Sequence, residues 1–400
     1  MRSITARQRR QLLCRRHHLA GDAAGPEEVT RAVVALHATD PASVYLSVLA
    51  RSSATTLADV AAAMYERRSL VRWLGMRRTL FLVPYDDVPL IQAAASCGVA
   101  AALRTRLVNQ LDRNGTRPPV EGDTAIWVDS LAERVEQAVR RRGSSTGSQL
   151  GEDEPRLRTT ILARAPSDRP QMVTSSLLTM LSAQGRIVRG TPTGAWTSRQ
   201  HQWESVEKWW PDGMPVLDTA QAQRELARRW LGRFGPATVD DLRWWTGWTK
   251  NTVHRALTDL PLEDIDLHGA PGIRLDTDEP DGPGGPDDSE TDPPVATLLP
   301  ALDATAMGWK HRDWYLAIDP TAIFDNAGNI GPTVWWDGEI IGTWATTAAG
   351  EIRTTCPVDR GTQATDAITS AAATLQHRLD GAVVTPSVRA PLERALAERD

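Results

Sequence analysis

The stretch FGPATVDDLRWWTGWTKNTVHRAL, residues 234–257, shows most clearly how the chain folds locally. Thr238 precedes Asp241 by three residues, which is the spacing of a capping-box variant at the start of a helix. The apolar spacing over 248–257 predicts a second helix directly after it. The stretch therefore predicts two short helices joined by a tight turn, with Trp244, Trp245 and Trp248 in the core of that unit.

The same plan occurs twice earlier in the chain. Four segments have the apolar spacing of helices: 5–20, 27–37, 41–51 and 57–66. They precede LVRWLGMRRTLFLVP (70–84), which predicts two short strands around a turn. Further on, MVTSSLLTMLSAQGRIVRGTPTGAWTSR (172–199) predicts a helix and then two strands joined by a Gly/Pro turn. Helix-turn-helix plus a two-stranded ribbon is the winged-helix plan, so we expect three such units in tandem.

The charge of the chain is unevenly distributed. The segment 276–292 carries eight acidic residues and no basic one, so without it the net charge changes from −5 to +3. Its Pro, Gly and Asp content predicts an acidic linker or long loop, and 140–155 is typical of a second flexible loop. Only three of the 45 basic residues are lysines. A GC-rich genome accounts for most of that arginine bias, although arginine would also suit a surface that faces DNA.

The part after the acidic segment has the pattern of strands. DWYLAI, TVWWDGEIIGTWA and EIRTTC alternate in hydrophobicity, and Asp337-Gly338 predicts a hairpin turn. We expect a small antiparallel β-barrel-like domain closed by a C-terminal helix, at 364–379 or 390–399. The fold class expected for the whole chain is α+β, mainly α. The expected domains are winged helices at 1–118, 119–212 and 213–275, the acidic linker at 276–294 and the C-terminal β-domain at 295–400.

Several classes of protein are disfavoured by the composition. No run approaches 18 apolar residues, and the basic N-terminus has no apolar stretch after it, so neither a membrane span nor a secretory signal is expected. The three cysteines are scattered, which favours neither a disulfide framework nor a cysteine metal site. His17, His18 and His201 lack partners at metal-ligand spacing, so no metal and no cofactor is predicted. A cytoplasmic location follows as the expectation.

The corner LHATDP, residues 36–41, puts an imidazole, a hydroxyl and a carboxylate within four residues. In the simplest interpretation Asp40 caps the helix that begins with Pro41, Thr39 is a turn residue, and His37 ends the preceding helix. In the functional interpretation, positions 37 and 39 face a groove while residue 38 packs inward. The imidazole and the hydroxyl could then hold one water molecule between them.

Four stretches of the chain resemble the AlkZ/AlkX group of winged-helix DNA glycosylases. They are VVALHATDPASVYLSVLARS (33–52), LVRWLGMRRTLFLV (70–83), LLPALDATAMGWKHRDWYL (298–316) and PTVWWDGEIIGTW (332–344). The resemblance spans nearly the whole chain in the right order. It implies three tandem winged helices around duplex DNA and a C-terminal β-domain. It also implies hydrolysis of the N-glycosidic bond of an alkylated purine, leaving an abasic site without strand cleavage.

By this resemblance the catalytic pair falls on His37 and Thr39, with Asp40 as a capping or charge-stabilising neighbour. The family carries glutamine, an apolar residue, and then glutamine or aspartate in this loop. Both of those polar positions are replaced here. The departure and the GC-rich bias fit a branch in antibiotic-producing bacteria that removes bulky adducts as self-resistance. We expect a monomer that acts on double-stranded DNA carrying an alkylated base.

Other basic residues are candidates for contact with DNA, because winged-helix ribbons face the duplex. They are Arg51, Arg72, Arg77, Arg78, Arg186, Arg189, Lys310 and Arg312. Two further classes of protein stay open. One is a winged-helix transcription regulator, and the other is a protein that sequesters a genotoxic small molecule in a tryptophan-lined cleft. A glycosylase alone would produce alkali-sensitive sites at an adducted base.

Overall fold

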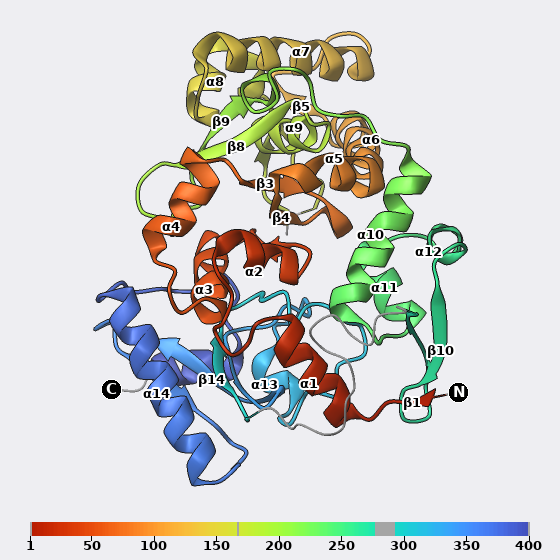
Figure 1. The fold of residues 1–400 in the computed structure, drawn as a ribbon. Coiled ribbons are helices and arrows are strands. Elements are labelled where there is room, and N and C mark those ends of the chain that lie inside the picture. Colours follow the sequence, from red (N-terminus) through yellow and green to blue (C-terminus); the bar gives the residue numbers. More distant parts are fainter. Residues whose placement is uncertain (1, 166–167, 277–292, 399–400) are drawn as a thin grey trace. The chain divides into compact units, whose positions relative to one another are not determined.

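The structure, a computed structural model, describes residues 2–165, 168–276 and 293–398. The expected acidic linker therefore lies almost wholly outside the described residues. By internal contacts the chain divides into two compact units. The first comprises residues 1–70, 81–84 and 224–400, and the second comprises 71–80 and 85–223. The fold mixes helices with several small sheets (Figure 1), as expected for an α+β chain.

The N-terminal part of the first unit is mainly helical. Its elements are α1 (Ala6–Arg16), α2 (Pro26–Ala32), β2 (Leu36–His37), α3 (Pro41–Arg51), α4 (Leu57–Ala61), a π-helical turn (Ala62–Glu66) and β4 (Leu80–Pro84). Strand β2 pairs antiparallel with β4, with Leu36 opposite Leu82 and His37 opposite Phe81. Pro41 begins α3 directly after its N-cap, as expected of proline at the first helical position.

The next part of the first unit contains the two helices predicted from 234–257. Its elements are α10 (Thr219–Phe234, which begins in the second unit), α11 (Val239–Thr246), α12 (Lys250–Leu257), β10 (Leu262–Asp266), β11 (Pro271–Leu275) and the short β1 (Arg2–Ser3). The side chains of Thr238 and Asp241 form the reciprocal bonds of a capping box, which confirms the predicted start of α11. Strand β10 pairs antiparallel with β11 and parallel with β1.

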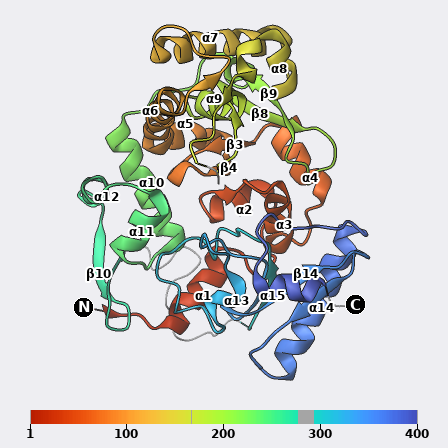
Figure 2. The same cartoon turned by 180° about the vertical axis from the view of Figure 1, so that it is seen from behind.

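The C-terminal part of the first unit is an open sheet with helices against it. Its elements are β12 (Ala296–Leu299), α13 (Pro320–Ile323), β13 (Thr333–Trp336), β14 (Glu339–Thr346), β15 (Ile352–Thr355), α14 (Thr362–Leu379) and α15 (Pro391–Ala397). Helices α14 and α15 pack on this sheet (Figure 2). The strand order β12-β13-β14-β15 leaves two edges, so among the described residues the expected barrel-like closure is absent. DWYLAI contributes only an isolated bridge at Leu316 rather than a strand.

The second unit consists of two helical layers with short strands. Its elements are β3 (Leu70–Leu74), a 3-10 turn (Met76–Arg78), α5 (Val88–Ile91), a π-helical turn (Gln92–Ser96), α6 (Cys97–Asn114), β5 (Thr116–Arg117), α7 (Thr124–Arg142), α8 (Gly147–Asp153), β6 (Thr160–Ile161), β7 (Gln171–Met172), α9 (Val173–Ala183), β8 (Ile187–Pro192) and β9 (His201–Ser205). Helices α7 and α9 pack against the β8–β9 hairpin (Figure 1), and their apolar faces share one buried cluster.

The prediction of a flexible loop over 140–155 is wrong for most of that range. Helix α7 continues to Arg142, and α8 begins after Thr146, whose side chain forms a capping box with Gln149. The Gly and Ser residues of this stretch mark the short turn between two helices.

One helical stretch, Tyr85–Asn114, is long and apolar enough to cross a membrane, with a mean hydropathy of 1.2. The core helix of a soluble protein passes the same test, and 44% of this stretch is buried. It is weak evidence for a membrane segment.

Candidate active site

The corner begins with an unusual backbone turn. Helix α2 ends at Ala32, and the backbone N–H of Ala35 then donates to the carbonyl oxygen of Val33 at 2.6 Å. The residue between them, Val34, has φ of 62°. A γ-turn with positive φ at its centre is rare and strained, and a β-branched residue in that position adds to the strain. The predicted continuation of this helix to His37 is therefore wrong. His37 lies in β2 and not at the end of a helix.

Of residues 37–39, only Thr39 is exposed. His37 is only 9% exposed and its ring lies 4.7 Å from the ring of Phe81, centre to centre. Ala38 is buried and Thr39 is exposed. The prediction is that positions 37 and 39 face a groove while residue 38 packs inward; Ala38 and Thr39 agree with it. His37, by contrast, lies mostly inside the protein, with one edge near the surface.

Asp40 uses both carboxylate oxygens to hold the backbone. It is buried, its Oδ1 accepts from the backbone N–H of Ala42 at 3.2 Å, and it is the N-cap of α3. Its Oδ2 accepts from the backbone N–H of Ser387 at 2.7 Å. The carboxylate thus ties the corner to the segment between α14 and α15, as a structural anchor.

Helix α3 is held in place by a buried polar network. Ser43, Ser47 and Arg51 lie one turn apart on the same face of the helix. Ser43 Oγ donates to the carbonyl oxygen of Ala301 at 2.6 Å, and Ser47 Oγ donates to Asp303 Oδ2 at 2.7 Å. Two of the four stretches that carry the family resemblance, 33–52 and 298–316, therefore meet in space.

The expected contact of Arg51 with DNA is contradicted by its position. Its side chain is completely buried and donates to both carboxylate oxygens of Asp303, at 2.9 and 2.7 Å. It also donates to Thr305 Oγ1 at 2.6 Å. Although burial alone would raise the pKa of Asp303, Arg51 and the other hydrogen-bond donors hold that pKa below its usual range. Arg51 is a structural residue, which its sequence neighbours could not indicate because its partner lies 252 residues away.

His17 extends the same network. It is fully buried, with Nδ1 2.9 Å from Thr305 Oγ1 and Nε2 3.2 Å from the carbonyl oxygen of Arg233. Burial, and next the charge of Arg51, lower the pKa of His17 well below its usual value. His17 is therefore neutral at neutral pH and serves as a hydrogen-bonding core residue.

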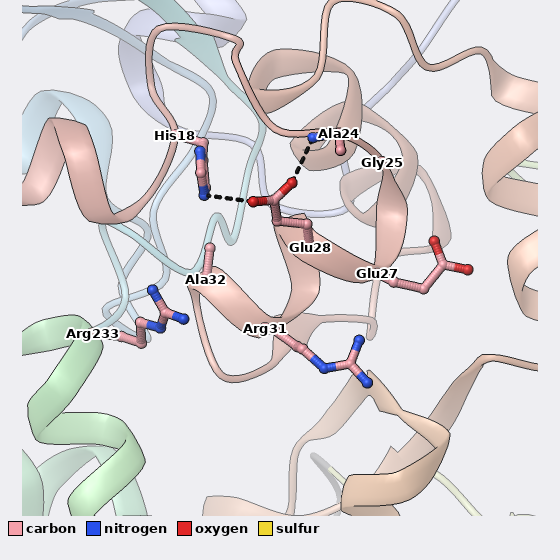
Figure 3. A pocket seen from close by; sticks show the side chains of 8 residues that line it. All are labelled: His18, Ala24, Gly25, Glu27, Glu28, Arg31, Ala32 and Arg233. Atoms are coloured by element: carbon pink, nitrogen blue, oxygen red, sulfur yellow. Dashed lines mark hydrogen bonds and ion pairs between the residues drawn. The ribbon is translucent and has the colours of Figure 1, made fainter. Parts of the chain in front are cut away.

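A cavity of about 550 Å³ lies beside α2 (Figure 3). Nε2 of His18 lies 3.7 Å from Glu28 Oε1, and Glu28 Oε2 accepts from the backbone N–H of Ala24 at 2.6 Å. Figure 3 shows the guanidinium groups of Arg31 and Arg233 away from this pair. The lining carries both signs of charge, on Glu27, Glu28, Arg31 and Arg233, so this cavity does not favour an anion.

Two more predicted DNA contacts belong to the first unit. Lys310 is exposed and forms an ion pair with Asp240 at 3.1 Å. The guanidinium of Arg312 lies 4.9 Å from the ring centre of Trp244 and 4.7 Å from that of Phe324. Its Nε donates to the carbonyl oxygen of Trp309, and burial lowers its pKa. Lys310 is the more accessible of the two.

The remaining predicted contacts belong to the second unit. Arg77 and Arg78 are exposed at the turn of the 70–84 hairpin, with φ of 54° and 59°. Arg186 is partly buried and its Nε donates to Glu136 at 2.6 Å. Arg72 is buried on β3, and its Nη2 donates to the carbonyl oxygen of Gly190 at 2.6 Å. A solvated phosphate contact for Arg72 is therefore contradicted, whereas Arg77 and Arg78 are exposed as expected. Arg189 is half-buried beside Trp203.

Sequence reasoning missed Asp303, Thr305, His17 and Ser387, which together support the corner. No local pattern marks them, because each acts across a long sequence separation. Within 2–165, 168–276 and 293–398, no three His, Cys, Asp or Glu side chains are grouped as a metal site.

Comparison with known proteins gives the family. No curated protein sequence matches the chain. The solved structure of DNA glycosylase AlkZ from Streptomyces sahachiroi is similar in fold, with a TM-score of 0.71 and 20% sequence identity. That match covers 96% of this chain and 99% of the other. A family model described as DNA glycosylase AlkZ-like matches residues 30–398. The chain therefore belongs to the AlkZ-like family of DNA glycosylases.

Proposed function

We propose that this protein is a monofunctional DNA glycosylase that hydrolyses the N-glycosidic bond of alkylated purines, at N7-guanine or N3-adenine adducts. The observation that carries the proposal is the corner at 37–40 in a chain of this family. An exposed hydroxyl, Thr39, follows an imidazole whose edge reaches the surface, on a backbone anchored by Asp40.

The proposed reaction does not require a strongly acidic side chain. Alkylation at N7 or N3 gives the purine a positive charge, so the base leaves without being protonated by a strong acid. The enzyme has to place a water molecule at C1′ and stabilise a transition state like an oxocarbenium ion. As the C–N bond breaks, its electron pair goes to the purine, and water adds to C1′ and loses a proton. An abasic site remains and the strand is intact.

In this mechanism His37 and Thr39 hold the water between them. His37 accepts its proton or orients it, and Thr39 provides a second hydrogen bond. His37 lies in a strand, so the helix C-terminal position expected from the sequence does not apply to it. Asp40 positions the corner. Both of its carboxylate oxygens already accept hydrogen bonds from backbone N–H groups.

We infer that the DNA is held by three winged-helix modules, with boundaries near 1–118, 119–212 and 213–275. Support comes from a pairing repeated three times. In each group, a residue between two successive helices pairs antiparallel with the second strand of the hairpin that follows: His37 with Phe81, Ser145 with Trp203, and Ala237 with Ile273. The strand paired in this way belongs in turn to β3–β4, β8–β9 and β10–β11, the two-stranded ribbons that the winged-helix plan requires.

Arg77 and Arg78 in the first module, and Lys310 in the C-terminal part, are the proposed phosphate contacts, because they are exposed. Arg186 and Arg312 are the less accessible candidates, since each is partly buried. The partner is double-stranded DNA with an alkylated base, bound by a monomer. Replacement of both usual glutamine positions by His37 and Thr39 supports bulky natural-product adducts as substrates and a role in self-resistance.

The experiment is incubation with duplex carrying one defined N7-alkylguanine, followed by alkali. We expect breaks at the adducted base after alkali and none before it, with free alkylguanine detected by mass spectrometry. A transcription regulator would bind one unmodified sequence and release no base. A sequestering protein would bind the free alkylating agent and leave the adducted duplex unchanged.

A further inference from the structure

The β8–β9 hairpin carries two basic side chains on one face. Arg189 on β8 lies directly opposite Trp203 on β9. His201 is two residues before Trp203, so its side chain projects from the same face. The guanidinium carbon of Arg189 lies 5.1 Å from the ring centre of Trp203, and the His201 ring lies 4.7 Å from it, edge-on.

A third basic residue reaches this place from another element. Arg72 on β3 donates through Nη2 to the carbonyl oxygen of Gly190, the residue after Arg189. Two guanidinium groups from distant parts of the sequence are therefore neighbours in the second unit. Burial, and next the nearby charge of Arg72, lower the pKa of Arg189 to about 10. Arg189 still carries its charge at neutral pH.

Arg189 and His201 have no compensating negative charge among the described residues. Arg189 forms no hydrogen bond or ion pair there, and its Nε is buried without a partner. Nδ1 of His201 bonds to the carbonyl oxygen of Arg199 at 3.1 Å, while its Nε2 is also buried without a partner. No carboxylate contributes to the shifted pKa of either residue. By contrast, three arginines of the same unit each pair with an acid: Arg142, Arg156 and Arg186.

Such an arrangement is costly unless an anion joins it. A partly buried charge without a partner loses its hydration and gains nothing in return, and a second like charge beside it adds repulsion. The guanidinium group matches the geometry of phosphate oxygens, to which it can donate two parallel hydrogen bonds. The neutral ring of His201, whose pKa is lowered to about 3 mainly by burial, adds a polar atom and no further charge.

We propose that Arg189 binds a phosphate-type oxyanion on this face of the β8–β9 hairpin, and that the buried charge of Arg72 strengthens the attraction without contacting the anion. Two sources share that chemistry, a backbone phosphate of DNA and inorganic phosphate. If DNA supplies the anion, the inference rests on the proposed function, and Arg189 is a further contact to the DNA backbone. If inorganic phosphate does, the site is independent of that function.

The first arm of the test uses the whole protein without DNA. Its melting temperature is measured in sodium phosphate and in sodium chloride at equal ionic strength, together with calorimetric titration of inorganic phosphate. The test variant is Arg189→Met, which keeps an unbranched stem against Trp203 and removes the charge. The matched control is Arg113→Met on α6, an exposed arginine that also forms no ion pair among the described residues.

The direction of the change in melting temperature distinguishes an anion-binding arginine from a structural one. We expect Arg189→Met to raise the melting temperature in chloride by roughly 2–4 °C, because it removes an uncompensated charge. It should also abolish the extra stabilisation by phosphate seen in the wild type and in the Arg113→Met control. A structural role would instead make Arg189→Met less stable in both buffers.

The second arm measures affinity for unmodified duplex across a range of salt concentrations. If DNA supplies the phosphate, Arg189→Met lowers the slope of log affinity against log salt by about 0.9. If inorganic phosphate does, that slope is unchanged while the first arm remains positive. Neither arm requires base excision, so a failure of the proposed function would not be mistaken for failure of this site. Loss of stability in both buffers, with no response of the wild type to phosphate and an unchanged slope, overturns the proposal.

Discussion

Asp40 is the residue at the corner whose role the geometry defines best. Asp40→Ala removes the cap of α3 and leaves the N–H of Ser387 without its acceptor. We expect the free energy of unfolding to fall by about 1–3 kcal/mol, measured by urea denaturation. Asp40→Asn keeps one carbonyl oxygen as an acceptor and should be destabilised less.

The same pair of variants tests whether Asp40 has a direct chemical role. If it only positions the corner, Asp40→Asn should excise base within a few-fold of the wild-type rate when enzyme is saturating. A well-folded Asp40→Asn protein that is slower by orders of magnitude would assign Asp40 to the reaction itself.

Arg51 provides a second prediction at this scale. Arg51→Met leaves the buried carboxylate of Asp303 without its partner, so we expect the free energy of unfolding to fall by about 3–5 kcal/mol. The double variant Arg51→Met/Asp303→Leu should recover much of that stability, because no buried charge remains. If Arg51→Met had wild-type stability but bound duplex DNA poorly, the structural role would be contradicted and a DNA contact supported.

Among the elements, the hairpin at 70–84 is where the structure and the proposed DNA surface agree. Arg77 and Arg78 are exposed at its turn. Arg77→Ala/Arg78→Ala should weaken binding to all duplex sequences alike and lower the salt slope by about 1 for each phosphate that the variant no longer binds. Arg353→Ala/Arg360→Ala, which removes the same charge from the C-terminal part, is the control. Equal effects of the two double variants would contradict a specific role for this hairpin.

Elements with local signals could be predicted from the sequence. The start of α11 follows from Thr238 and Asp241, and the turn of the β13–β14 hairpin follows from Asp337-Gly338, which have φ of 48° and 77°. The end of helix α2 at Ala32 could not be predicted from the sequence. It is followed by a γ-turn at Val34 with positive φ, a backbone conformation that β-branched residues rarely adopt. The failure occurs next to the candidate site, where a strained backbone is commonly found.

At the scale of the whole molecule, the site depends on partners far apart in the chain. Spacing and the family resemblance pointed to His37 and Thr39. They could not show that α3 rests on Asp303 and Thr305, or that Ser387 holds Asp40. Charge type alone also grouped buried Arg51 with exposed Arg77, because burial is a property of the folded chain.

The buried network predicts how stability depends on pH. The pKa of His17 is lowered on folding, so below about pH 6.5 the unfolded chain binds a proton that the folded chain does not. Stability should fall with decreasing pH by up to about 1.4 kcal/mol per pH unit from this group. Asp303, whose pKa is also lowered, adds a further decrease below about pH 4.

Chemical denaturation between pH 7.5 and 5 measures this dependence, with His17→Gln as the comparison. The variant should be less stable at pH 7.5 and should be destabilised less by acidification. The same pH slope in both proteins would mean that His17 is not the group responsible.

The most direct test of the central claim is single-turnover release of an N7-alkylguanine from duplex DNA, with enzyme in excess. The wild type should release the base and leave an alkali-sensitive site. His37→Ala and Thr39→Val should each slow release by roughly 100-fold while duplex affinity stays within a few-fold. Full excision rates in both variants, at wild-type affinity, would contradict a hydrolytic water held at this corner.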